Sequence, residues 1–142
     1  MKVYKAVCIK SINGYYLKRC SPNSRFVSVC GGSPSLTYEI GQETVPVVGR
    51  CFGFNSLENA KKFIRESGYG SAVLEGEATD VRKTFKMAKP FYKDSDKDPF
   101  KSFWTARKMK RKLCVKIVAA PQGTVTFSSF VPEKLVFETG ME

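Results

Sequence analysis

Residues 55–77 read NSLENAKKFIRESGYGSAVLEGE and contain the clearest helix signal in the chain. The apolar residues that recur at helical spacing are Leu57, Ala60, Phe63 and Ile64. Asn55 is the expected N-cap, because Glu58 follows three residues later and completes a capping box. Gly68 is the expected stop, and residues 71–77 have the composition of a strand that leaves the helix. The stretch therefore predicts a helix joined to a sheet.

Short strand signals lie on both sides of this helix. An Asn-Gly turn at residues 13–14 is expected to join antiparallel strands at 3–9 and 15–20. A proline at position 46 makes the stretch 42–49 an edge strand or a loop. Further strands are expected at 26–30, 36–40, 113–119, 124–131 and 134–138, and the third and fourth of these are expected to form a hairpin.

Two later segments add helix signals. Residues 79–89 fit either a helix or an alternating strand. Asp98-Pro99 is a typical helix entry, which predicts a helix over about 99–111. The order of elements predicts an α+β fold with a mainly antiparallel sheet and two or three helices, in a single domain over residues 1–142.

The residue types that are missing limit the chemistry. Histidine is absent, so neither a Ser-His-Asp or Cys-His relay nor a His-ligated metal is possible. Five cysteines without close pairs predict buried thiols rather than a disulfide framework or a zinc site. We therefore expect no catalytic residues of these classes, no metal and no cofactor.

The N-terminus and the apolar runs predict the compartment. Lysines at positions 2, 5 and 10 interrupt any apolar run of the kind found in a secretory signal. No stretch approaches the ~20 apolar residues of a membrane span. The expectation is a cytoplasmic protein.

Positive charge is concentrated in residues 82–116, hereafter the basic segment. It holds 13 basic residues against three aspartates, a net charge of +10, whereas the other 107 residues hold 11 basic and 10 acidic groups. Such asymmetry is typical of proteins that bind nucleic acid, an anionic membrane surface or an acidic protein. The alternative is a solvated face that only keeps the protein soluble.

The predicted helix over 99–111 would place a basic ridge on one side and aromatic residues on another. Such a ridge suits phosphates, because Lys and Arg displace condensed counterions. The expected polyanion-binding residues are Arg82, Lys83, Lys86, Lys101, Arg107, Lys108, Arg111 and Lys112. Phe91, Tyr92 and Trp104 are the candidates for stacking on unpaired bases, although Trp104, like Phe100 and Phe103, also suits a core position.

The leading hypothesis is a non-enzymatic binding protein that engages nucleic acid through the basic segment. The alternative is an interaction or inhibitor protein that docks on an acidic protein surface. Small size and the absence of familiar motifs are also typical of an accessory protein of a virus or mobile element. The sequence does not predict the oligomeric state.

A third hypothesis is enzymatic. Glu75 and Glu77 are two residues apart on a predicted strand, so both carboxylates point to one face, where repulsion is expected to raise one pKa. With Arg19 and either Ser33 or Ser35, they resemble the motifs of the ADP-ribosyltransferase-like fold, which implies an Arg on an early strand, a Ser-rich strand and a Glu-x-Glu pair. The serines depart from the pattern because they lie in an expected loop, and the family's nicotinamide-stacking Tyr has no counterpart.

Overall fold

The computed structural model describes residues 1–29, 36–46, 49–68, 70–90 and 115–141. The described helices are α1 (Leu57–Ser67) and the 3-10 turn η1 (Thr139–Met141). The strands are β1 (Lys2–Ser11), β2 (Tyr16–Leu17), β3 (Ser24–Ser28), β4 (Thr37–Tyr38), β5 (Cys51–Phe54), β6 (Ala72–Thr79), β7 (Arg82–Lys83), β8 (Lys86–Pro90), β9 (Val115–Ala119), β10 (Thr124–Phe127) and β11 (Ser129–Glu138).

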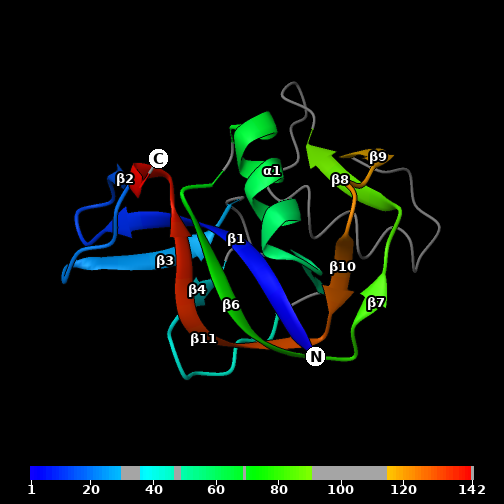
Figure 1. Ribbon diagram of the computed structural model, residues 1–142, viewed down its shortest axis with the longest axis horizontal. Coiled ribbons are helices and arrows are strands. Elements are labelled where there is room, and N and C mark those ends of the chain that lie inside the picture. Colours follow the sequence, from blue (N-terminus) through cyan, green and yellow to red (C-terminus); the bar gives the residue numbers. More distant parts are fainter. Residues whose placement is uncertain (30–35, 47–48, 69, 91–114, 142) are drawn as a thin grey trace.

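The described chain is mainly one antiparallel sheet with a single α-helix (Figure 1). Nine strands form the sheet in the order β11-β6-β1-β5-β10-β7, with β2 and β3 added to β1 and β4 added to β3. Strands β8 and β9 form a separate two-stranded ladder. The expected α+β fold with two or three helices is therefore wrong, because the ambiguous residues 79–89 form β7 and β8 and not a helix. The helix expected over 99–111 lies outside the described residues.

Strand β1 organises the sheet because its two halves have different neighbours. Its first half pairs with β6 on one side, from Lys2 to Val7, and with β5 on the other at Tyr4. From Val7 onward β3 takes the place of β5, and beyond Val7 β2 takes the place of β6. The second half of β1, from Cys8 to Ser11, thus lies between β2 and β3, and we call these three strands the β2–β1–β3 tip.

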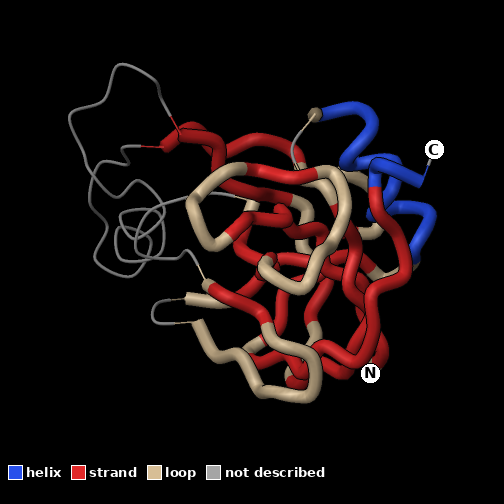
Figure 2. Tube along the Cα trace, turned by 90° about the vertical axis from the view of Figure 1, so that its left-hand side faces the viewer, coloured by secondary structure: helices blue, strands red, loops and turns tan. Residues whose placement is uncertain are grey.

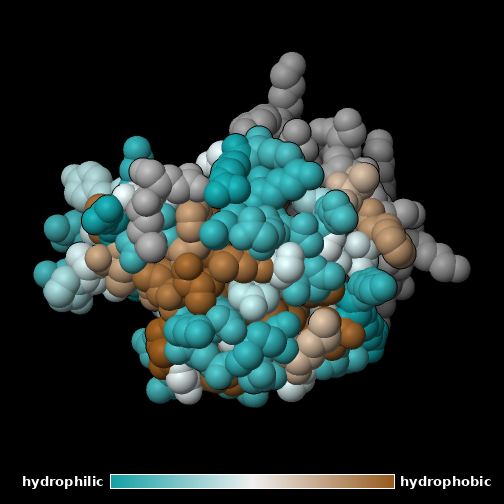
Figure 3. Space-filling model, in the orientation of Figure 1, coloured by the Kyte–Doolittle hydropathy of each residue, from teal (hydrophilic) through white to brown (hydrophobic). Residues whose placement is uncertain are grey.

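The sheet buries apolar residues on both of its faces. The inner face, around which the strands curve (Figure 2), holds the larger core: Val3, Val7, Ile9, Phe26, Tyr38, Cys51, Ala72, Leu74, Ala78, Val125, Phe127 and Phe130. On the outer face, Ala60 and Ile64 of α1 pack against Ala6, Val73 and Phe137. The side of α1 that faces away from the sheet is hydrophilic (Figure 3), as the amphipathic pattern predicts.

The ends of α1 confirm one expectation and correct another. Gly68 caps the C-terminus in the left-handed conformation, with φ of 73°. At the other end the N-cap is Ser56, whose Oγ accepts a hydrogen bond from the Asn59 backbone N–H at 3.2 Å. Asn55 precedes the cap, and its Oδ1 instead accepts a hydrogen bond from the side-chain Nδ2 of Asn59 at 3.1 Å. Two adjacent residues able to cap leave the start of a helix ambiguous by one position.

Two strand expectations are corrected as well. Strands β9 and β10 do not form a hairpin, since β9 pairs with β8 and β10 pairs with β5 and β7. No strand was expected at β5, a four-residue strand that contains Gly53. A Cβ on Gly53 would lie 2.7 Å from the Phe127 ring, so close packing selects a glycine that weakens the local strand signal. None of the described helices is long and apolar enough to cross a membrane.

Candidate polyanion-binding surfaces

The described start of the basic segment lies at the edge of the sheet. Arg82 and Lys83 form β7, pair with β10 opposite Thr126 and Val125, and are both exposed. Lys86 is the first residue of β8, opposite Ala119 of β9. Two of the eight predicted binding residues are thus placed on one edge strand, with a third nearby in the sequence.

The remaining predicted residues lie outside the described parts of the chain. They are Lys101, Arg107, Lys108, Arg111 and Lys112, together with the stacking candidates Phe91, Tyr92 and Trp104. The register nevertheless constrains where their segment begins and ends, because Pro90 of β8 pairs with Val115 of β9. Pro90 and Val115, the described residues that flank 91–114 in the sequence, therefore lie side by side at one end of the β8–β9 ladder.

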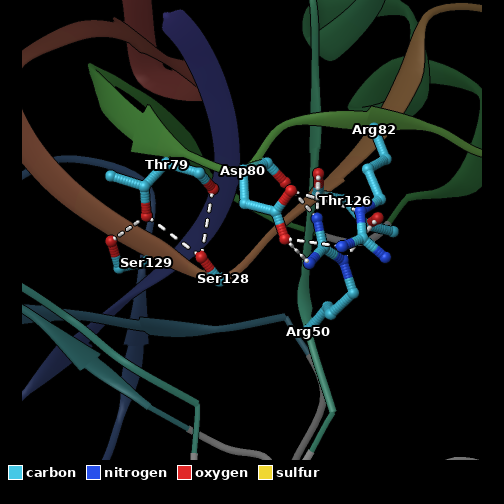
Figure 4. A network of polar contacts seen from close by, with 7 residues as sticks. All are labelled: Arg50, Thr79, Asp80, Arg82, Thr126, Ser128 and Ser129. Carbon is cyan, nitrogen blue, oxygen red and sulfur yellow. Dashed lines mark hydrogen bonds and ion pairs between the residues drawn. The ribbon is translucent and has the colours of Figure 1, made fainter.

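Arg82 belongs to a network of charged groups (Figure 4). Its guanidinium donates to the Asp80 carboxylate, with Nη2–Oδ2 at 2.9 Å and Nε–Oδ1 at 3.2 Å. Arg50 donates to the same carboxylate from the other side, with Nη1–Oδ2 at 2.7 Å. Arg50 and then Arg82 hold the pKa of Asp80 below its usual value. One carboxylate therefore offsets part of the charge of two arginines at this edge.

Arg50 also ties three elements together. Its Nε donates to Thr126 Oγ1 at 3.0 Å and its Nη2 to the Thr126 carbonyl at 3.2 Å, and Nη2 bonds the Asp80 carbonyl as well. Asp80 is the only non-glycine residue in the described ranges with a positive φ, 52°. A half-buried arginine thus fixes the turn between β6 and β7 against β10, which positions Arg82.

A hydroxyl cluster lies beside this network, where β10 turns into β11 (Figure 4). Thr79 Oγ1 is 3.0 Å from Ser128 Oγ and also contacts Ser129 Oγ. The Ser128 backbone N–H donates to the Thr79 carbonyl at 3.0 Å. These bonds hold the corner between the two strands, and none of the bonds recorded for the three hydroxyls goes to an acid or a base.

The carboxylates of the enzymatic hypothesis are engaged in ion pairs. Glu77 contacts the Met1 amine at 2.9 Å and Lys2 at 3.3 Å, and Glu75 contacts Lys134 at 3.5 Å. The hydrogen bonds from Met1 and Lys2 lower the pKa of Glu77. The expectation that repulsion raises a pKa is therefore wrong for Glu77, because the nearby cations have a larger effect on its pKa than the second carboxylate.

The other residues of that resemblance are not gathered around the pair. Arg19 follows β2 and donates through Nε and Nη2 to the Gly140 carbonyl, at 3.0 and 2.5 Å, near the chain's C-terminal end. Ser33 and Ser35 lie outside the described residues. Glu75 and Glu77 act as ion-pair partners between β6, β1 and β11.

The cysteines follow the expectation only in part. Cys51 is buried, and burial raises the pKa of its thiol despite the nearby cations of Lys5 and Arg50. Cys8 is half-buried, whereas Cys20 is exposed, and all three are free thiols. Cys30 and Cys114 are outside the described residues. Within the described ranges, no three His, Cys, Asp or Glu side chains come together in a way that could hold a metal ion.

One depression lies between α1 and the turn before β10. It has a volume of about 290 Å³ and is lined by Asn59, Lys62, Phe63, Glu66, Ser67, Pro121 and Gln122. Its lining mixes one cation, one carboxylate and an aromatic ring, all from a surface helix and a turn. This composition indicates no particular ligand.

The β2–β1–β3 tip forms a second basic surface that the count of charge along the chain did not reveal. Lys10 lies opposite Tyr16 on β2 and opposite Arg25 on β3. Tyr16 is 68% exposed and the Lys10 Nζ lies over its ring, 5.6 Å from the centroid. One signal was available in the sequence: residues 1–38 contain six basic residues and no Asp or Glu.

Comparison with known proteins gives no family. No protein-family model matches the chain. No curated protein and no solved structure matches it either. The function must therefore be inferred from the charges and the geometry of this chain.

Proposed function

We propose that this protein is a non-enzymatic binding protein whose basic segment, residues 82–116, engages a polyanion, with nucleic acid as the partner. The observation that carries the proposal is the net charge of +10 within 35 residues. Nucleic-acid backbones reward such density, because each neutralised phosphate releases counterions whatever the base sequence.

The described start of the segment supports this proposal. Arg82 and Lys83 lie on an edge strand with exposed side chains, so a long partner can approach them. Phe85 follows two residues later and is 81% exposed. An exposed aromatic ring beside cations is the combination that binds unpaired bases and their phosphates.

The test is direct binding by fluorescence anisotropy to labelled single- and double-stranded DNA and RNA at about 0.15 M salt, beside anionic phosphatidylserine vesicles. The wild-type protein is expected to bind at least one nucleic acid below micromolar Kd. Reversing Arg107, Lys108, Arg111 and Lys112 to Glu is expected to weaken binding by more than about 100-fold without changing the thermal unfolding midpoint.

A matched pair of milder variants separates local charge from total charge. Arg111→Gln with Lys112→Gln and Lys62→Gln with Arg65→Gln each remove two positive charges, but the second pair lies on α1. Only the first pair is expected to weaken binding strongly. The proposal is overturned if no nucleic acid binds below micromolar, if the two pairs weaken binding equally, or if the vesicles alone are bound.

A further inference from the structure

The outer face of the sheet is covered by α1 over only part of its length. Tyr4 and Ala6 of β1 pack against the helix. Cys8, the next residue of β1 on this face, is only half-buried and is not part of the outer-face core. Lys10 is the next residue of β1 on the same face, and it lies beyond the helix. Among the described residues, the outer-face core includes none from the tip, and Tyr16 and Arg25 are exposed.

The cross-strand register identifies which residues occupy the outer face of the β2–β1–β3 tip. Ile9, Leu17 and Phe26 form one row and turn toward the inner core. Side chains alternate along a strand, so the next row, Tyr16–Lys10–Arg25, points outward. Neighbouring strands are about 4.8 Å apart, which makes the row about 10 Å wide. An exposed ring, a half-buried lysine and an exposed arginine thus stand side by side across three strands.

The row itself carries positive charge only, although the exposed Glu39 directly follows β4, one residue beyond the Phe26–Tyr38 pair. Lys18 is exposed just after β2, and residues 1–38 contain no carboxylate side chain. Glu138 comes near from the C-terminal strand, but it accepts a hydrogen bond from the Cys20 backbone N–H at 3.0 Å. Unlike Arg82, neither Lys10 nor Arg25 is recorded in an ion pair within the described ranges. An anion is the chemical complement of this surface.

Aromatic rings distinguish the anion that would fit. Tyr16 is 68% exposed and Tyr15, in the same hairpin, is 72% exposed. The hydroxyl of an exposed tyrosine can donate to a phosphate, but its ring also offers a face on which an unpaired base stacks. Duplex bases are already stacked on one another, so the combination favours a single strand.

We propose that the outer face of the β2–β1–β3 tip binds single-stranded nucleic acid. One base stacks on Tyr16, and the adjoining phosphates contact Lys10 and Arg25. Figure 3 shows this lobe at the left of the molecule, away from the β7–β9 end. The inference does not depend on the basic segment binding the same partner.

The experiment measures anisotropy of labelled 12-nucleotide single-stranded and duplex oligonucleotides. Tyr16→Ser is expected to weaken single-strand binding roughly 5- to 100-fold, and Tyr16→Phe is expected to retain it, because the ring and not the hydroxyl stacks. Lys10→Gln with Arg25→Gln is expected to lower the slope of log K against log salt by about 1.4. The pair Lys62→Gln with Arg65→Gln is the charge-matched control, and thermal unfolding verifies that each variant is folded.

The outcomes separate this inference from the proposed function. Weakening by the tip variants alone supports the tip and overturns the basic segment as the site, whereas weakening by the Arg111/Lys112 pair alone does the reverse. Equal effects of the Tyr16→Ser and Tyr16→Phe substitutions overturn the stacking inference. Photo-crosslinking with 4-thiouracil-labelled RNA supplies a second readout, and crosslinks that do not map to the peptide containing Tyr16 also overturn it.

Discussion

The two basic surfaces lie at opposite ends of the molecule's longest axis and are built in different ways (Figure 1). The basic segment is dense in charge along the chain, and at its described start on β7 part of that charge is offset by Asp80, which pairs with both Arg50 and Arg82. At the β2–β1–β3 tip the charge is sparse along the chain, but the register brings Lys10, Tyr16 and Arg25 into one row. The basic segment has more charge along the chain and the exposed ring of Phe85 at its described start, whereas the tip has the exposed rings of Tyr15 and Tyr16.

This difference shows what a count of charge along a sequence can miss. A segment average reports residues that are neighbours in the chain, whereas a sheet face is assembled from residues 6 and 15 positions apart, as for Lys10 with Tyr16 and Arg25. The near-neutral total outside the basic segment also hides an uneven distribution, because all ten of those acidic residues follow position 38. A remainder with almost no net charge can therefore still carry a basic surface.

The largest expected effect tests whether the two ends share one scaffold. Gly76 of β6 lies between β1 and β11, opposite Val3 and Pro132, and a Cβ there would be 2.1 Å from the Val131 carbonyl oxygen and 2.9 Å from the Pro132 Cα. Because backbone must move, Gly76→Ala is expected to lower the free energy of unfolding by at least about 3 kcal/mol. Urea denaturation followed by tryptophan fluorescence and circular dichroism measures it, and binding at both ends is expected to fall together.

Gly68→Ala is the matched control for the Gly76 substitution. Gly68 has nothing within 4 Å of its ideal Cβ and has a positive φ, so alanine there introduces only backbone strain, about 1 kcal/mol. A Gly76→Ala protein with an unchanged unfolding midpoint would contradict the close approach of β6 and β11. Persistence of tip binding in an otherwise unfolded Gly76→Ala protein would show that the tip folds on its own.

A smaller effect is expected to disturb one end and spare the other. Arg50→Met retains the aliphatic chain but removes the bonds to Asp80 and Thr126, and the Arg50 side chain is only 17% exposed. The expected loss is about 1–3 kcal/mol, because polar partners are left unpaired. Lys134→Met breaks the more exposed pair with Glu75 and is expected to cost less than about 1 kcal/mol. Equal losses in chemical denaturation would show that Arg50 does not position β7.

The helix and the long strands could be predicted because their signals are local. The helical spacing and Gly68 predicted α1, the Asn-Gly turn predicted the pairing of β1 with β2, and the apolar pattern predicted most of β6. Pairing between distant segments could not be predicted in the same way. β9 pairs with β8 and β10 pairs with β5, both earlier in the chain, so a rule based on proximity in the sequence gave a hairpin that does not exist.

The same distinction between local and long-range signals applies to the two basic surfaces. Arg82 and Lys83 could be named as binding candidates because charge density is a property of the chain, and the structure places them on β7 with exposed side chains. The Asp80 pairing with Arg50 was not, since these residues are 30 positions apart and meet only when β5, β6 and β10 assemble. The row at Lys10 was missed for the same reason, although the absence of acidic residues before position 39 was visible.

Salt dependence separates the contribution of an aromatic ring from that of charged side chains. Counterion release makes the free energy of phosphate contacts depend on salt concentration, whereas the free energy of base stacking does not depend on it. The ratio of wild-type to Tyr16→Ser affinity is therefore expected to stay constant between 0.05 and 0.3 M salt, within about 2-fold. The ratio for Arg111→Gln with Lys112→Gln is expected to decrease by roughly 10-fold over this range, from a slope change of about 1.4. Anisotropy titrations at four salt concentrations measure both, and parallel behaviour would mean that Tyr16 does not act by stacking.

The smallest expected effects concern Asp80, the carboxylate that distinguishes the β7 end from the tip. Its folded-state pKa lies below the ordinary value of about 3.9 because of Arg50 and Arg82. A depressed folded pKa means that the ion pairs stabilise the fold above pH ~4, and that this stabilisation is lost as the pH falls through the folded pKa. Asn tolerates the positive φ at this position. Asp80→Asn is thus expected to be less stable than wild type at pH 6 and equally stable near pH 2, as measured by urea denaturation at each pH.

The same substitution should make the two ends more alike. Removing the Asp80 charge leaves Arg82 without its anionic partner, so nucleic-acid affinity is expected to increase by about 2-fold at 0.05 M salt and not at 0.3 M. Glu66→Gln, on α1, removes one negative charge from a different face and is the matched control. An equal gain from Glu66→Gln would mean that only total charge matters. A gain in affinity that is confined to Asp80→Asn and disappears in the Asp80→Asn, Arg82→Gln double variant would assign the gain to the β7 edge. There the Asp80 carboxylate neutralises part of the charge of Arg82.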